Sequence, residues 1–479
     1  MRFLFTTLQF VETDFYGRVG DRLRQGGHEV AHVTFSRLAA GALRRWGFRA
    51  FCLPDVMGEV GEGAAGEVER IERRYRLPSL RDVYRCDPAV RRTGEGAAVS
   101  RTLRHFRALE RVIDEVVPDA IVPEVGRETM REAALRVGTD RGARVLFLVN
   151  SPFPRPLRLY VDTYDGPIVA PEEVRPLSDA ERDEVEQFIA RFTDRAKPIL
   201  SYRRTFVTPA KLRDFVRHVA VRHVHERDND YLRPSSFVAN YGRQKLREAA
   251  ARRLYEPGPL ARPGERQPSP LAGPGERPFV YFPLHVTDDY KIERIIPHCA
   301  DQEYLIRQVA DSLPQGYDVV LKEHPHSLGR NPLGMLRRLA ALSNVRLVDP
   351  YTSSHELMRR AVAVTVISST VGLEALLYGK GVLTMGRPYY AGYGVTVDVE
   401  SFRDLRSAVP AVLDFRPDPE RVLAFLHACM RSTYEGEVVW QDDSDANAAS
   451  VAATLERVAW EHLPRRPEGA RRVEPVLAR

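Results

Sequence analysis

Cysteine is scarce in this sequence, and its positions exclude several classes of protein. The four cysteines, Cys52, Cys86, Cys299 and Cys429, lie far apart and form no Cys-x-x-Cys pair. This distribution argues against a disulfide framework and against a zinc site built from paired cysteines. A reducing compartment therefore fits the composition best.

Long apolar segments are also missing. The N-terminal stretch MRFLFTTLQFVETDF carries a short apolar run that Glu12 and Asp14 interrupt, so it lacks the long hydrophobic region of a signal peptide. No apolar run approaches the ~20 residues that a membrane-spanning helix needs. We expect a cytoplasmic protein, and the sequence leaves open a peripheral contact with the inner face of the cell membrane.

The charge balance gives only a weak indication of a partner. The 71 lysines and arginines exceed the 65 acidic residues slightly, for a net charge of +6. A nucleic-acid-binding protein would concentrate basic residues with interleaved aromatics in one domain, whereas only a patchy basic stretch occurs here, at residues 203–253. We expect no nucleic-acid partner, and a phosphate-bearing substrate or an anionic membrane surface would suit the excess charge.

The 479 residues exceed the size of a typical single core, so two domains are expected. The first part reads as strand–helix–strand units, with strands predicted at residues 2–7, 29–35, 120–123 and 144–149 and helices at 16–25 and 128–141. Strands that alternate with helices predict a parallel sheet, which binds ligands at the carboxyl ends of its strands. We assign residues 1–255 to an N-terminal lobe that contains a basic helical insertion at 179–254 with His218, His223 and His225.

A proline- and glycine-rich segment separates this lobe from a second α/β series. Residues 256–278 contain seven prolines and four glycines and are the best candidate linker. The second lobe is predicted at 279–415, with strands at 279–283, 318–322, 345–348, 363–367 and 382–385 and helices at 302–313, 333–342, from 354, and at 371–378. Helices at 419–431 and 446–462 make up a C-terminal helical part, residues 416–463, and the basic tail at 464–479 is predicted to be disordered.

The segment YDVVLKEHPHS, residues 317–327, places polar residues directly after a buried strand. Proline at 325 restrains His324 toward an extended conformation, so the imidazole can be held at the carboxyl end of the sheet. There it can donate to an anionic phosphate oxygen or protonate a leaving group, and Lys322 and Pro325 belong to the same candidate donor site. The alternative is a surface turn with solvated histidines.

The segment AVTVISSTVGLEALLYGKGVLTMG, residues 363–386, ends a strand in hydroxyl residues and begins a helix. The hydroxyls are those of Ser368, Ser369 and Thr370. A helix N-terminus offers unpaired N–H donors and a partial positive charge, which together favour a phosphate. Gly372 would allow a close approach of backbone to ligand, and Glu374 would accept from ribose hydroxyls. The alternatives are simple helix capping and an exposed helical glutamate.

Taken together, KEHPHS, SSTVGLEALLYGK and the continuation GRPYYAGYG at residues 386–394 resemble the capsule polysaccharide biosynthesis glycosyltransferases, the family that contains bacterial Kdo transferases. The match covers about residues 279–398 and is similar, more distantly, to bacterial sialyltransferases. The resemblance implies an α/β fold of the GT-B type, with two Rossmann-like parallel-sheet lobes that face a cleft. It also implies a CMP-activated 3-deoxy-ulosonic acid or related donor, with His324 on its phosphate and Ser368 and Ser369 nearby.

Glu124 is the candidate catalytic base in the first lobe, residues 1–255, which we expect to be the acceptor side. It follows a predicted strand in PDAIVPEVGRETMREA, residues 118–133, and precedes Gly126 and a helix. The distant sialyltransferase relatives place an acidic pair before a glycine at a comparable strand end, whereas this chain has one acid. Burial would raise the pKa of such a carboxyl and suit it to deprotonate an acceptor hydroxyl. A capping or ion-paired surface glutamate is the alternative.

Three weaker features complete the set. Asp228-Asn229-Asp230 matches the Asp-x-Asp pattern of metal-dependent transferases, but it follows a basic helical stretch and is interpreted as a turn, so no metal is predicted. His285 follows the first strand of the second lobe and could line the same site, with a structural loop as the alternative. Tyr389 and Tyr390 would shape the donor pocket or pack a loop.

These predictions favour a metal-independent glycosyltransferase with no cofactor beyond its co-substrate, a nucleotide-sugar, and with a glycan or glycolipid as acceptor. A sugar-nucleotide epimerase or hydrolase on the same fold is the nearest alternative, because a fold does not select a reaction. A non-catalytic glycan-binding or assembly protein is the alternative from another class.

Overall fold

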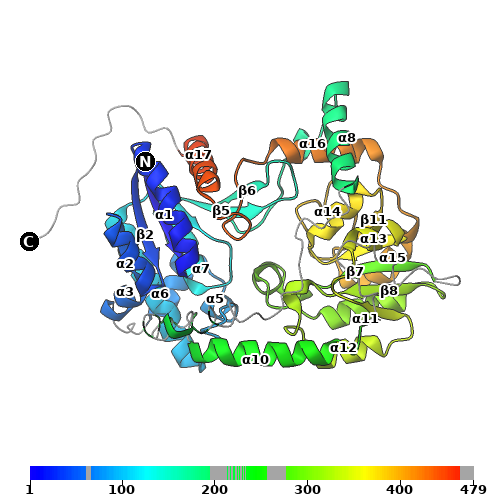
Figure 1. The fold of residues 1–479 in the computed structure, drawn as a ribbon, viewed down its shortest axis with the longest axis horizontal. Coiled ribbons are helices and arrows are strands. Elements are labelled where there is room, and N and C mark those ends of the chain that lie inside the picture. The colour runs from blue at the N-terminus through cyan, green and yellow to red at the C-terminus, as the bar shows by residue number, and fades with distance from the viewer. Residues whose placement is uncertain are drawn as a thin grey trace, which may run out of the picture.

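The computed structural model describes residues 1–60, 66–194, 234–255 and 277–463, together with single residues between 213 and 231. These residues form two α/β lobes, each built around one six-stranded sheet (Figure 1). The predicted fold class, α/β with two Rossmann-like parallel-sheet lobes, is confirmed. The linker at 256–276, the tail at 464–479, the histidines His218, His223 and His225, and both Asp228 and Asp230 lie outside the described residues.

The first sheet has the strand order β3-β2-β1-β4-β5-β6, which is the Rossmann order. Its strands are β1 (Arg2–Thr7), β2 (Glu29–Thr34), β3 (Arg49–Cys52), β4 (Ala120–Pro123), β5 (Arg144–Asn150) and β6 (Leu157–Val161). Strand β6 runs antiparallel to β5, and the other neighbours are parallel. The carboxyl ends of β1, β2, β4 and β5 therefore meet at one edge.

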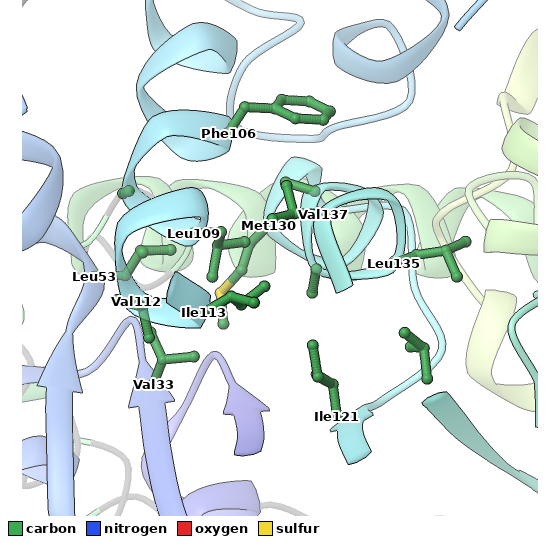
Figure 2. Close-up of a cluster of buried hydrophobic side chains, with 14 of the residues drawn as sticks. Val33, Leu53, Phe106, Leu109, Val112, Ile113, Ile121, Met130, Leu135 and Val137 are labelled. Atoms are coloured by element: carbon green, nitrogen blue, oxygen red, sulfur yellow. The ribbon is translucent and has the colours of Figure 1, made fainter. Parts of the chain in front are cut away.

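Helices cover this sheet because their apolar faces and the strands bury each other. They are α1 (Phe10–Gln25), α2 (Arg37–Arg45), α3 (Leu53–Glu59), α4 (Glu67–Arg74), α5 (Leu80–Tyr84), α6 (Glu95–Val116) and α7 (Thr129–Asp140). Figure 2 shows Leu109, Val112 and Ile113 of α6 packed with Met130 and Val137 of α7 in one core cluster. Truncation of such a side chain to alanine typically costs about 2–5 kcal/mol.

The second sheet repeats the same topology, with the order β12-β11-β10-β7-β8-β9 and parallel neighbours throughout. Its strands are β7 (Phe279–Pro283), β8 (Asp318–Lys322), β9 (Val345–Val348), β10 (Ala363–Val366), β11 (Gly381–Thr384) and β12 (Val397–Asp398). Its helices are α11 (Gln302–Ser312), α12 (Leu333–Ala340), α13 (Ser354–Arg360), α14 (Thr370–Leu377) and α15 (Leu405–Asp414). The chain order reverses between β7 and β10, where this fold class binds its ligands.

Among the described helices, four lie at the connections between the lobes. Helix α8 (Asp179–Asp194) packs against α16 (Pro419–Arg431) and α14 of the second lobe, and α10 (Pro234–Ala251) contacts α12. The chain then returns, so that α17 (Asp445–His462) packs on α1 of the first lobe (Figure 1). The lobe boundary at residue 255 stays a prediction. Helix α8 lies before this boundary in the sequence but packs with helices of the second lobe.

Charged contacts hold the two lobes together around the short π-helix η2 (Lys291–Ile295), which follows β7. Arg127 of the first lobe donates to Glu293 at 2.5 Å and to Asp288 at 3.2 Å. Arg294 donates to the Arg127 carbonyl at 2.9 Å and pairs with Glu132 of α7. Across the described ranges, no helix combines the length and the apolar character needed to cross a membrane.

Candidate functional site

The predicted donor-site residues of the second lobe gather at the carboxyl edge of its sheet. His285 follows β7, Lys322 ends β8 and leads into His324, and Ser368 follows β10. Because β7 lies between β8 and β10, these residues come from three adjacent strands at the point where the chain order reverses. The topology thus brings together motifs that are about 80 residues apart in the sequence.

His285 is held as a neutral acceptor at the centre of this edge. The backbone N–H of Ser368 donates to its Nε2 at 3.0 Å, and Gln302 bonds both its backbone N–H and its carbonyl. Burial lowers the pKa of His285 to about 3, and the positive charges of Lys291 and His324 add to the effect. His285 therefore joins the two strand ends and lies close enough to His324 to sense its charge.

Glu323 anchors the turn after β8. Glu323 is buried and accepts from the Tyr255 hydroxyl and the Asn331 amide. Pro325 begins the 3₁₀ turn Pro325–Ser327, and the Ser327 N–H donates to the His324 carbonyl at 2.7 Å. His324 thus stands half-buried at the strand end, on a backbone fixed by its neighbours.

Lys322 of β8 and Glu374 of α14 are half-buried and close enough for their charges to interact. Nζ of Lys322 donates to the Ser354 hydroxyl at 2.6 Å. Burial lowers the pKa of Lys322 to about 8, which Glu374 opposes, and raises the pKa of Glu374 to about 7, which Lys322 opposes. Both groups therefore titrate near neutral pH, a behaviour that clusters at functional sites.

Ser369 and Thr370, at the start of α14, differ in their contacts and their exposure. The Ser369 hydroxyl caps the helix by accepting from the Val371 N–H at 3.2 Å, while Thr370 is exposed at the first helical position. A Cβ atom added to Gly372 would lie 2.1 Å from the Tyr390 hydroxyl oxygen. Glycine at 372 therefore makes room for Tyr390, whose hydroxyl donates to the Ser369 carbonyl.

Tyr389 faces a residue of the first lobe that the sequence analysis did not single out. The guanidinium of Arg158, on β6, lies 4.2 Å from the centre of the Tyr389 ring. Tyr389 and Tyr390 pack edge to face, with ring centres 5.3 Å apart. The sequence pattern does not predict a buried arginine in the middle of a short strand, because the arginine interrupts the apolar run by which a strand is identified.

Glu124 lies at the carboxyl end of β4, with 7% of its surface exposed. Its carboxylate accepts from the Tyr16 hydroxyl at 3.4 Å and from the Trp440 indole N–H at 3.3 Å. Burial, reinforced by the nearby Glu12 carboxylate, holds the pKa of Glu124 well above its usual range, and Arg131 opposes the shift. The structure therefore provides a carboxyl group that is hard to ionise at the edge of the first sheet.

Glu12 supplies the second acid that the Glu-Val-Gly stretch lacks. Buried in the first turn of α1, it accepts from the Leu8 N–H at 2.8 Å. Arg131 lies 3.5 Å from Glu12, 3.8 Å from Glu124 and 3.0 Å from Glu128. The signal was present in the sequence, since Glu12 interrupts the apolar N-terminus just after a strand.

Gly126 allows this arrangement. A Cβ atom there would lie 2.3 Å from a Glu128 carboxylate oxygen and 2.9 Å from the Arg131 side chain. The arginine can reach the carboxylates because residue 126 has no side chain.

A pocket of about 550 Å³ with a mixed polar and apolar lining opens where the lobes meet, beside η2. Its charged lining includes Arg85, Arg136 and Arg294 together with Asp82 and Glu132. Within the described part of the chain, no group of three His, Cys, Asp or Glu side chains is placed to hold a metal ion. The prediction of metal independence stays a prediction.

The chain matches the family model described as capsule polysaccharide biosynthesis protein over residues 185–434. Capsule polysaccharide modification protein LipA of Neisseria meningitidis serogroup B is 34% identical over 96 residues, which cover 20% of this chain and 14% of that protein. Protein FixF of Sinorhizobium fredii is 29% identical over 150 residues, or 31% of this chain and 36% of that protein. The matches thus span well under half the length of these curated relatives.

Among solved structures, Thermosulfurimonas dismutans KpsC, a beta Kdo 2,4 transferase, is 19% identical with a TM-score of 0.32. That alignment covers 64% of this chain and 79% of the other.

Proposed function

The chain belongs to the capsule polysaccharide biosynthesis protein family, and from that premise we propose that it is a GT-B-type glycosyltransferase. It transfers a sugar from a nucleotide-activated donor to a glycan or glycolipid acceptor. The observation that carries the proposal is the convergence of His285, His324, Lys322 and the start of α14 at the edge of the second sheet. Donors and positive charge meet there, where this fold class binds nucleotides.

The second lobe holds the donor in this proposal. His324 and the N-terminus of α14, with Ser368, Ser369 and Thr370, contact the phosphate, because a helix N-terminus and an imidazole both donate to oxyanions. Lys322 adds positive charge behind them, and Glu374 accepts from the ribose hydroxyls. The negative charge that develops on the leaving phosphate oxygen is met by donors already in place, which is the most effective form of electrostatic stabilisation.

The first lobe activates the acceptor. Glu124 is buried beside the Glu12 carboxylate, the burial and the neighbouring charge both raise its pKa, and its ionised form takes the proton of the acceptor hydroxyl. The hydroxyl oxygen then bonds to the anomeric carbon as the bond from that carbon to the phosphate oxygen breaks. A raised carboxyl pKa suits a base that works near neutral pH.

The proposed donor is a CMP-activated ulosonic acid such as Kdo. This follows from the resemblance of the segments KEHPHS and SSTVGLEALLYGK to the family that contains bacterial Kdo transferases. The proposed acceptor is a growing surface polysaccharide or its lipid-linked form, and the pocket beside η2 is of a size suited to part of a sugar chain. The place of action at the cytoplasmic face of the membrane stays a prediction.

A panel of CMP-, UDP- and GDP-sugars tests the proposal directly. The full chain is incubated with each donor, with and without capsule oligosaccharide acceptors, and products are followed by mass spectrometry. We expect acceptor-dependent consumption of one donor class. Conversion to an epimer or rapid hydrolysis without acceptor would instead establish the epimerase or hydrolase function, and no binding of any donor would favour a non-catalytic protein.

Substitution of His324 tests the donor site itself. His324→Ala removes a charged hydrogen bond to phosphate and should weaken donor binding about 10- to 100-fold while leaving the melting temperature unchanged. Isothermal titration gives the dissociation constant. An affinity equal to that of the wild type would remove His324 from the site.

A further inference from the structure

Arg158 is enclosed between the two lobes. It lies on β6 of the first lobe, with only 3% of its surface exposed. Its guanidinium carbon is 4.6 Å from the centre of the Tyr160 ring and 4.2 Å from that of Tyr389, which belongs to the second lobe. The two aromatic contacts hold the guanidinium plane where the lobes meet.

Three donor groups of this contact have no acceptor in the part of the chain that the structure describes. Nε and Nη1 of Arg158 and the hydroxyl of Tyr389 are all buried without a hydrogen-bond partner among the described residues. A buried charge without a partner is strongly unfavourable, and buried hydroxyls are normally bonded. Because two such side chains from different lobes touch each other, a ligand that accepts from both explains them better than packing does.

The surroundings favour an anion. Lys291 of η2 is close enough to Arg158 for the two charges to interact, and burial together with Arg158 lowers the pKa of Lys291, while Asp165 and Asp289 oppose the shift. Asp289 also accepts from the Lys291 backbone N–H at 2.8 Å, and Asp165 accepts from the Tyr160 hydroxyl at 3.2 Å. These two carboxylates thus have other partners, and within the described ranges no ion pair joins Arg158 to a carboxylate.

The location adjoins the candidate donor site. Tyr389 is followed by Tyr390, whose hydroxyl donates to the Ser369 carbonyl at the start of α14. Lys291 in turn acts on the pKa of His285, which accepts from the Ser368 N–H. An anionic group that accepts from Arg158 and Tyr389 would therefore lie on the same side of the second lobe as a phosphate at the helix N-terminus.

We propose that Arg158 and Tyr389 bind an oxyanion of the sugar donor, so that the first lobe takes part in donor recognition. The chemistry is shared by a carboxylate on the donor sugar and by a donor phosphate. A guanidinium presents parallel N–H groups that match two oxygens of either one. The identity of the ligand as a sugar donor rests on the proposed function, whereas the oxyanion site does not.

The test uses the full chain and three variants. Arg158→Met keeps length but removes charge and donors, Tyr389→Phe keeps the ring but removes the hydroxyl, and Arg175→Met is a control with the same charge change at a surface ion pair. The probes are sulfate, CMP, CMP-N-acetylneuraminate, and the pair UDP-glucose and UDP-glucuronate. Binding is measured by titration calorimetry and by the ligand-induced shift of the melting temperature.

We expect Arg158→Met to weaken binding of the oxyanion-bearing probe about 10- to 100-fold, Tyr389→Phe to weaken it less, and the control to leave it unchanged. The melting temperature of free Arg158→Met should equal or exceed that of the wild type, because an unpartnered buried charge is removed. A loss confined to the carboxylated sugars assigns the carboxylate, and a loss that includes CMP assigns the phosphate.

Two outcomes would overturn the proposal. Equal affinity of the wild type and Arg158→Met for every probe excludes the oxyanion site, as does a free variant that melts at a lower temperature with unchanged affinity, since Arg158 would then be a structural contact. Arg158-dependent stabilisation by sulfate with no binding of any nucleotide-sugar would preserve the site and refute the proposed function.

Discussion

Glu374→Gln should stabilise the protein at mildly alkaline pH and have little effect in acid. Burial raises the folded-state pKa of Glu374 from 4.5 to about 7. Between those values the folded state holds more protons than the unfolded state, so the free energy of unfolding falls as pH rises. A shift of this size corresponds to a loss of about 3 kcal/mol by pH ~8.

Lys322 contributes with the opposite pH dependence. Its folded-state pKa is lowered from 10.5 to about 8, so the unfolded state holds more protons in that interval and stability rises with pH there. The two groups together place a minimum of stability between their folded pKa values. The attraction of Lys322 is already contained in the pKa of about 7 for Glu374, so the net gain of Glu374→Gln at about pH 8 should stay at about 3 kcal/mol.

Urea unfolding of the wild type, Glu374→Gln and the exposed control Glu400→Gln measures this difference at about pH 5 and about pH 8. The Gln variant should unfold at a higher urea concentration only at the higher pH, and the control should match the wild type at both. Equal midpoints at both values, or a loss of stability at about pH 8, would refute the reasoning, since Glu374 would then be hydrated or firmly paired.

Three further predictions concern other parts of the site. Glu124→Gln should lower turnover at least about 100-fold with unchanged donor affinity, because the amide keeps its shape but takes no proton, and a variant with full turnover would point to Glu128 or a substrate-assisted route. Chelation with EDTA should leave transfer unchanged, and activity lost to EDTA and restored by Mg²⁺ or Mn²⁺ would direct attention to Asp228 and Asp230. Gly372→Ala should cost about 1–3 kcal/mol in chemical denaturation because its Cβ collides with the Tyr390 hydroxyl, and the added variant Tyr390→Phe should relieve part of that loss.

The strands that the sequence predicted best are those with buried apolar runs between clear turn residues. The observed bounds of β1, β4, β7, β8 and β9 agree with the predicted residue numbers. A parallel strand is buried on both faces, so its sequence is an uninterrupted apolar run that is easy to delimit. Strand β6 was not predicted, because it is a short antiparallel edge strand with Arg158 and a second polar-tipped residue, Tyr160, on one face.

The sequence predicted those site residues that directly follow a predicted strand. His324, Ser369 and Glu124 follow strands, so their place at a sheet edge follows from topology. Pairs such as Glu12 with Glu124, or Arg158 with Tyr389, join residues more than 100 positions apart, and no local pattern encodes their contact. Such long-range pairs are formed by the packing of whole elements.

Several buried ionisable groups have an unfavourable environment in the free protein. They lie at the carboxyl edges of the sheets or where the lobes meet. Glu124 with its like-charged neighbour Glu12, Glu374 at the edge of the second sheet, and Arg158 between the lobes each oppose folding in the free protein. A substrate that supplies a hydroxyl, a ribose and an oxyanion would complement all three. Binding energy released at these points would act on both lobes at once, because Arg158 and Tyr389 come from opposite sides. Donor binding should therefore raise the cooperativity of unfolding between the lobes, an effect that a site confined to the second lobe would not produce.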